Sequence, residues 1–365
     1  MGCDVGDPSY PPLDTPPLQI VDILATTELD DDFQPIRTSL SPDGSTLVLP
    51  TASFVLRFDR FLLPGSAIRQ SVCLSSNLNL DVQTAEDCEN GVFLEPTYDP
   101  VRRQVIYRRS VDEPLLALDS RYRLTVLPPV EGGGAAGFRA FDGAALAGRM
   151  QFDFTIVAQD PGASDELPPG GDLFCARDPE CLGGCGGDLA CELACEKVGV
   201  EPLITGCAFG AGCHRNVFEG ATLLRGAAAA LDLETAGAIV ATALGKVAHQ
   251  TQTGEHADEG DRNPGRFGRA MPIIDPANPG NSYLLYKLVI GPNVADDPAS
   301  PEKVAASPEE IARLRASVVV GLPMPPYYDA NPTAVASFPI GGAELISAWI
   351  AQGAPVRDCS QPPFQ

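Results

Sequence analysis

The first half of the chain alternates hydrophobic and polar residues with a period of two. In residues 53–60, Phe54, Leu56 and Phe58 fall on one face of an extended segment, as expected for a strand with one buried face. Further strand-like stretches lie at residues 18–24, 104–109, 121–127 and 150–157. Turn signals such as Pro42-Asp43-Gly44 separate them. Five or more short strands predict an antiparallel β-sandwich over residues 18–158.

Helical spacing replaces this alternation in the last third of the chain. A segment opened by Asp232 places Ala236, Ile239, Val240 and Ala243 on one face. Residues 307–310 read Ser-Pro-Glu-Glu, a capping box with proline at the first helical position. Two more helices are expected after Ser282 and over residues 342–353, the second burying Leu345, Ile346, Trp349 and Ile350. These stretches predict an all-α domain over residues 198–365.

Two segments rich in proline, glycine or cysteine flank the predicted sandwich. Residues 1–17 carry five prolines and predict an extended tether. Residues 159–197 combine a linker with a run of cysteines spaced by four, which places each pair on one face of a helical turn. This run, formed by Cys181, Cys185, Cys191 and Cys195, predicts a disulfide-stapled helical hairpin; tetrahedral zinc is the competing interpretation.

Net charge narrows the classes of partner. With 48 acidic and 25 basic residues, the chain carries a formal charge of −23, so nucleic acid and anionic membrane surfaces would repel it. No apolar run is long enough to span a bilayer. The acidic stretch at residues 28–32 predicts a solvated loop, with Ca²⁺ binding as the less favoured alternative. The sequence shows no convincing nucleophile–base pair, which favours a carrier or binding protein over an enzyme.

Eleven cysteines predict export to an oxidising compartment, the periplasm or the outer cell surface. Cys3 follows Met1-Gly2 in a lipobox-like setting, which predicts a lipid anchor; a free or intermolecular thiol is the alternative. Cys73 and Cys88 are expected to pair within the sandwich. Cys175 and Cys359 complete an even group with the four cysteines of the hairpin. Cys207 and Cys213 remain.

The last two cysteines precede a histidine. Cys207, Cys213 and His214 follow the order of a covalent c-type haem site, in which two thiols bind the haem and the imidazole binds its iron. The spacing is C-x5-C-H, three residues longer than C-x-x-C-H, and Gly210 and Gly212 give the longer loop conformational freedom. A Cys207–Cys213 disulfide beside an ordinary histidine is the alternative.

Several later segments appear in the order of a known family. After His214 come Ala230-Leu231-Asp232-Leu233, residues 275–288, residues 321–326 (Gly-Leu-Pro-Met-Pro-Pro) and residues 349–354 (Trp-Ile-Ala-Gln-Gly-Ala). This order resembles the planctomycete/myxobacterial-type cytochrome c-like domain and covers roughly residues 203–356. The resemblance implies His214 as proximal and Met324 as distal ligand of a haem c iron. From the residues themselves, the stiff Pro-Met-Pro-Pro setting also favours Met324, then Met271, then His249 or His256.

The order of the predicted strands resembles bacterial Ig-like domains of surface proteins, through residues 54–58 and 122–126. Two functions follow. The first is a lipid-anchored, monohaem, c-type cytochrome-like electron-transfer protein with a redox protein partner. The second is a haem-free surface binding or adhesion module, stapled by disulfides, with a degenerate cytochrome fold.

Overall fold

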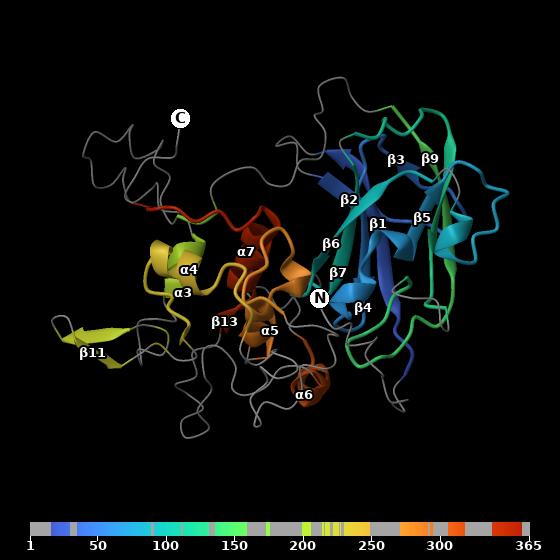
Figure 1. Cartoon of the computed structure of the whole chain (residues 1–365). Coiled ribbons are helices and arrows are strands. Elements are labelled where there is room, and N and C mark those ends of the chain that lie inside the picture. The colour runs from blue at the N-terminus through green and yellow to red at the C-terminus, as the bar shows by residue number, and fades with distance from the viewer. Residues whose placement is uncertain are drawn as a thin grey trace, which may run out of the picture. The chain divides into compact units, whose positions relative to one another are not determined.

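The computed structural model divides the chain into two compact units, Met1–Pro169 and Gly170–Gln365, which we describe separately (Figure 1). The structure describes residues 16–29, 35–88, 91–110, 112–130, 136–158, 173–175, 199–205, 214, 216–219, 222–225, 227, 230–248, 271–290, 293–294, 306–317 and 338–359.

The first unit contains a five-stranded and a four-stranded sheet. The larger sheet is antiparallel, in the order β2 (Pro35–Ser39), β1 (Ile20–Leu29), β4 (Phe54–Phe58), β7 (Gln104–Arg109) and β6 (Leu94–Asp99). The smaller has the order β3 (Leu47–Val48), β9 (Met150–Ile156), β8 (Arg121–Val126) and β5 (Val72–Ser75). In it, β3 runs parallel to β9 and the other pairs are antiparallel. Three short 3-10 helices, Pro64–Ser66, Arg69–Ser71 and Ala85–Asp87, lie in the connections.

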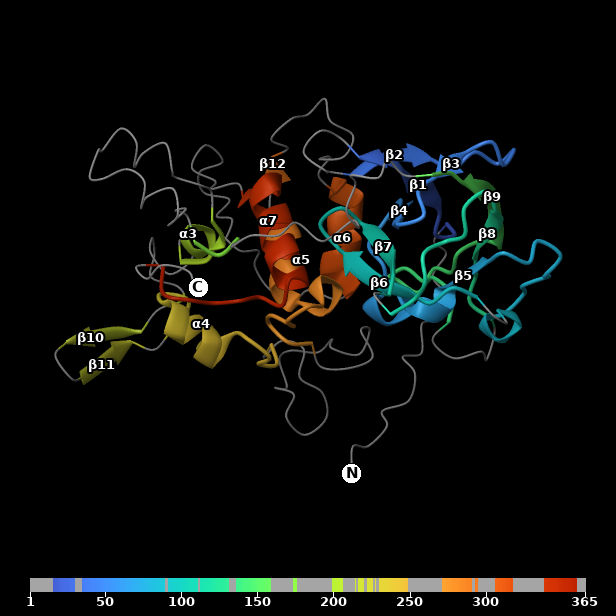
Figure 2. The ribbon, with the colours of Figure 1, turned by 90° about the horizontal axis from the view of Figure 1, so that it is seen from above.

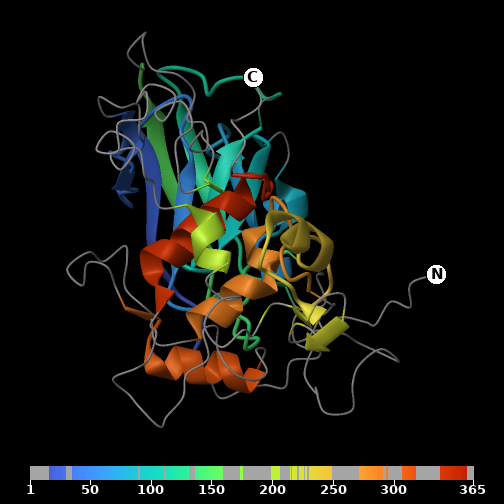
Figure 3. The ribbon, with the colours of Figure 1, turned by 90° about the vertical axis from the view of Figure 1, so that its left-hand side faces the viewer.

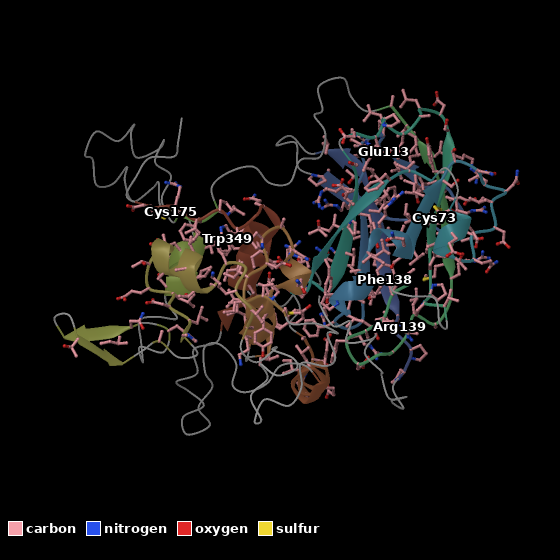
Figure 4. The ribbon with its side chains drawn as sticks, viewed as in Figure 1. Cys73, Glu113, Phe138, Arg139, Cys175 and Trp349 are labelled. Carbon is pink, nitrogen blue, oxygen red and sulfur yellow. A yellow bond between two sulfur atoms is a disulfide. The ribbon has the colours of Figure 1, made fainter. Side chains whose placement is uncertain are left out.

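A single hydrophobic core joins the inner faces of the two sheets, so that they form a sandwich. The period-two pattern explains it, since Phe54, Leu56 and Phe58 of β4 are all buried. Phe54 meets Phe154 of β9 with ring centroids 5.3 Å apart. Phe58 meets Phe138, which is labelled in Figure 4, at 4.9 Å. Each buried phenylalanine contributes about 1.5–3 kcal/mol to stability.

The segment between β5 and β6 is fastened to the smaller sheet. A disulfide joins Cys73 of β5 to Cys88, and both pack into a small cluster with Val82 and Leu127. The Arg123 guanidinium donates to the Leu78 carbonyl at 2.7 Å. These contacts fix the loop at both ends of its span.

A buried arginine holds the start of the sandwich. Arg60 forms ion pairs with Asp59 at 2.9 Å and with Asp142 at 3.4 Å, and donates to the carbonyl groups of Pro16 and Pro17. Burial alone would lower the pKa of Arg60, but the two carboxylates raise it above its ordinary value. The Arg60 guanidinium therefore stays protonated, and its hydrogen bonds hold the backbone of residues 16–17 against the sandwich.

The second unit mixes helices with short strands (Figure 2). Its helices are α3 (Val200–Thr205), α4 (Ala236–Thr242), α5 (Tyr283–Val289), α6 (Pro308–Ser317), α7 (Ile340–Ala351) and the 3-10 turn η7 (Pro279–Asn281). The strands β10 (Val217–Glu219) and β11 (Thr222–Arg225) form an antiparallel hairpin. The strands β12 (Asn293–Val294) and β13 (Phe338–Pro339) pair in parallel.

The core of the second unit is built on α7, which packs against α3 and α5 (Figure 3). Trp349 of α7 is fully buried, lies 5.6 Å from the Phe174 ring, and donates from its indole N–H to the Pro355 carbonyl at 2.8 Å. Cys175, which follows Phe174 in the sequence, forms a disulfide with Cys359. Phe174, Cys175 and the segment from Pro355 to Cys359 thus come together beside Trp349.

The predicted all-α cytochrome c-like domain was wrong, because the described part of this unit contains two strand pairs and further β-bridges. The bridges join Leu244 to Ile274 and Val247 to Pro272. Strands of two to four residues carry too few positions to show alternation, so helical spacing elsewhere dominated the sequence pattern. Helix α4 also begins later than expected, at Ala236, with the Thr235 hydroxyl accepting from the Ala238 N–H at 3.1 Å.

Candidate functional site

His214 lies three residues before the start of β10, and its backbone is held by a hydrogen bond. Its carbonyl accepts a hydrogen bond from the Leu233 N–H at 2.9 Å. The imidazole is half-buried, and its Nδ1 atom is shielded from solvent. Burial alternates along the segment that holds His214: Leu231 and Leu233 are buried, whereas Asp232 between them is only partly buried. The histidine is therefore fixed to a segment that is itself anchored in the core.

A side-chain bridge reinforces this attachment two residues further on. Asn216 donates from Nδ2 to Asp232 Oδ2 at 2.7 Å, and its Oδ1 accepts from the Ala227 N–H at 3.0 Å. The other carboxylate oxygen, Asp232 Oδ1, accepts from the Glu234 N–H at 3.0 Å. Each oxygen of Asp232 therefore has its own donor, which fixes the plane of the carboxylate.

Helix α4 completes the network through one hydroxyl. Thr242 Oγ1 accepts from the Asp232 N–H at 3.0 Å and lies 2.8 Å from the Asp232 carbonyl and 2.9 Å from the Ala238 carbonyl. Because Thr242 sits in the last turn of α4, the segment around Asp232 has a rigid neighbour. The orientation of residues 214–216 is thus tied to a helix.

Met271, the second-choice distal ligand, is buried at 1 % exposure in a different local structure. Its carbonyl accepts from the Ala248 N–H at 2.9 Å, where residues 243–248 run beside residues 271–274. The same short segment leads into α5, since Tyr283 and Leu284 donate to the carbonyls of Pro272 and Ile273. Met271 is therefore a buried residue of a well-packed, hydrogen-bonded segment.

Of the residues predicted to bind haem, His214 and the second-choice ligand Met271 belong to the described residues. The predicted positions outside them are Cys3, Cys181, Cys185, Cys191, Cys195, Cys207, Cys213, His249, His256 and Met324. Disulfides join Cys73 to Cys88, with Cα atoms 5.7 Å apart, and Cys175 to Cys359, at 5.4 Å. Within the part of the chain that the structure describes, no three His, Cys, Asp or Glu side chains are grouped to hold a metal ion.

Sequence reasoning assigned Asp232 to the start of a helix and missed its bridge to Asn216. The local signal was present, because aspartate commonly accepts from the backbone N–H two residues ahead, as Asp232 does from Glu234. The bridge to Asn216 spans 16 residues, and no local pattern predicts it.

No family model, curated protein or solved structure matches the chain. Among the helices of the described residues, none is long and apolar enough to cross a bilayer.

Proposed function

We propose that the chain is an exported electron-transfer protein that holds one haem c covalently through Cys207 and Cys213, with His214 as an axial ligand. The observation that carries this proposal is the way His214 is fixed by its carbonyl, with Nδ1 shielded from solvent. A metal-binding imidazole keeps one nitrogen toward the protein and offers the other to the metal. The shielded Nδ1 of His214 supports this arrangement.

When bound, the haem supplies an iron that exchanges single electrons. The chain's own task is then to hold the axial side chains still, so that little rearrangement accompanies each transfer. His214 meets this need through its attachment to Leu233. Met324 is the proposed second ligand, since a thioether suits low-valent iron, and the buried Met271 is its competitor.

The setting proposed for this activity is the periplasm or the outer cell surface. The disulfides Cys73–Cys88 and Cys175–Cys359 support export, because such bonds persist in oxidising compartments. A lipid on Cys3 would keep the protein at a membrane, with a redox protein as its partner. Metabolic labelling of the precursor with a fatty acid tests the anchor: label retained in a Cys3→Ser variant would contradict it.

A haem-free binding module is the second candidate. Two disulfides already staple the described residues, and the long C-x5-C spacing allows Cys207 and Cys213 to form another. In that case the sandwich would contact the partner and His214 would be an ordinary surface-loop residue.

Intact mass under denaturing conditions separates the two candidates. Protein from a host with c-type haem maturation should carry the mass of the chain plus one haem, and Cys213→Ser should loosen or abolish the attachment. His214→Ala should keep the attachment and change the haem absorption spectrum, whereas the matched change His249→Ala should leave the spectrum as in wild type. A haem-free mass with Cys207 linked to Cys213 would refute the electron-transfer proposal.

A further inference from the structure

We infer that Asp232 is a positioning residue for His214, an inference that rests on the proposed axial role of this histidine. The evidence is a clamp with two points of attachment. In one, the Leu233 N–H donates to the His214 carbonyl at 2.9 Å; in the other, Asn216 Nδ2 donates to Asp232 Oδ2 at 2.7 Å. Adjacent residues, 232 and 233, thus hold residues 214 and 216.

Two attachments restrict more than one does. A single backbone hydrogen bond lets the segment swing about that bond, while a second bond two residues away fixes its direction. In the proposed haem site, Cys213 would restrain the chain on the other side of the histidine. The clamp therefore fixes the direction of the backbone from which the imidazole projects.

Residues 232 and 233, which form the clamp, are themselves held in place by burial and by further hydrogen bonds. Leu233 is fully buried, so the backbone of the clamp cannot move without exposing core. The Glu234 N–H occupies the second oxygen of Asp232, and Thr242 ties the Asp232 backbone to α4. Helix α4 thus holds Asp232, Asp232 holds Asn216, and Asn216 restrains the backbone next to His214.

An exchange of the two side chains tests this assignment without changing the net charge. Asp232→Asn or Asn216→Asp alone places two amides or two carboxylates face to face. The double variant restores a donor opposite an acceptor, and it leaves an oxygen available to both the Ala227 and the Glu234 N–H groups. Thr242→Ser keeps the hydroxyl and is the matched control.

Two readouts report the orientation of the imidazole. In the haem-loaded full chain, each single variant should shift the reduction potential and the spectrum of axial ligation, and the double variant should return both toward wild type. In the haem-free Cys207→Ser/Cys213→Ser chain, each single variant should change the His214 imidazole nitrogen shifts. The Leu233 amide should also exchange with deuterium about ten-fold faster, the change expected from losing one hydrogen bond.

The outcomes are separable from failure of the proposed function. Absence of attached haem would refute that function, while the imidazole shifts would still report whether the clamp orients His214. Single variants that only lower the unfolding temperature, with wild-type potential and imidazole shifts, would overturn the positioning role. So would a double variant that fails to restore them. If a single variant does not fold, Asn216→Ala, which leaves the Glu234 N–H on Asp232, supplies the same comparison.

Discussion

Removing the Cys175–Cys359 disulfide should destabilise the second unit more than removing Cys73–Cys88 destabilises the first. The bond closes a loop with a sequence separation of 184, against 15 for Cys73–Cys88. Chain-entropy arguments give about 5 kcal/mol for the longer loop and about 3 kcal/mol for the shorter one. Because single domains are stable by roughly 5–15 kcal/mol, Cys175→Ala/Cys359→Ala should leave this unit marginal.

Trp349 makes the measurement specific. It is the only tryptophan in the chain, it is fully buried, and it packs on Phe174 beside the disulfide. Its fluorescence during a urea titration should therefore follow the second unit. With a slope of about 2 kcal/mol per molar urea, the expected loss of about 5 kcal/mol lowers the midpoint by about 2.5 M.

The matched control is Cys73→Ala/Cys88→Ala, which removes a disulfide from the unit that has no tryptophan. It should leave the Trp349 transition in place and lower the stability of the sandwich. The entropic reasoning would be refuted if the Trp349 midpoint of the Cys175/Cys359 variant stayed within about 0.3 M of wild type, or if the control shifted it equally.

Two further predictions concern the sandwich. Gly91→Ala should lower the unfolding temperature of the sandwich, since its Cβ would lie 2.6 Å from Cys88 Sγ; the unfolding temperature should stay near wild type for Gly148→Ala, where the added Cβ meets nothing within 4 Å. Asp153 accepts from Arg123 at 2.6 Å, and this hydrogen bond lowers its pKa below the ordinary value. The stabilisation is therefore present above about pH 4 and is lost as the pH falls through the folded-state pKa. Asp153→Asn should flatten the acid limb of an unfolding-versus-pH curve, and an unchanged limb would contradict the assignment.

The strands that could be predicted from sequence were those with two distinct faces. Residues 54–58, 104–109, 121–126 and 150–156 alternate visibly and form β4, β7, β8 and β9. No residue of the edge strand β2 is buried, so its sequence lacks the alternation that reveals a strand. Its position depends on pairing with β1, which no local pattern specifies.

The sequence predicted where helices occur better than it predicted the residues at which they begin. Ser282 does precede α5, but its hydroxyl bonds within the turn of residues 275–278 and does not cap the helix. At His214, the neighbouring cysteines made a candidate site visible because they are adjacent in sequence. Its support from Asn216 and Asp232 depends on tertiary structure and could not be predicted.

The Cys175–Cys359 bond also gives the second unit a closed covalent topology. Every peptide bond between residues 175 and 359, including those around His214, lies within one ring. A protease that cuts this ring once converts it into an open chain whose two pieces remain joined through sulfur. A chain so built releases no fragment at the first cut, and the cysteines at 207 and 213 stay on the same molecule as the tryptophan core.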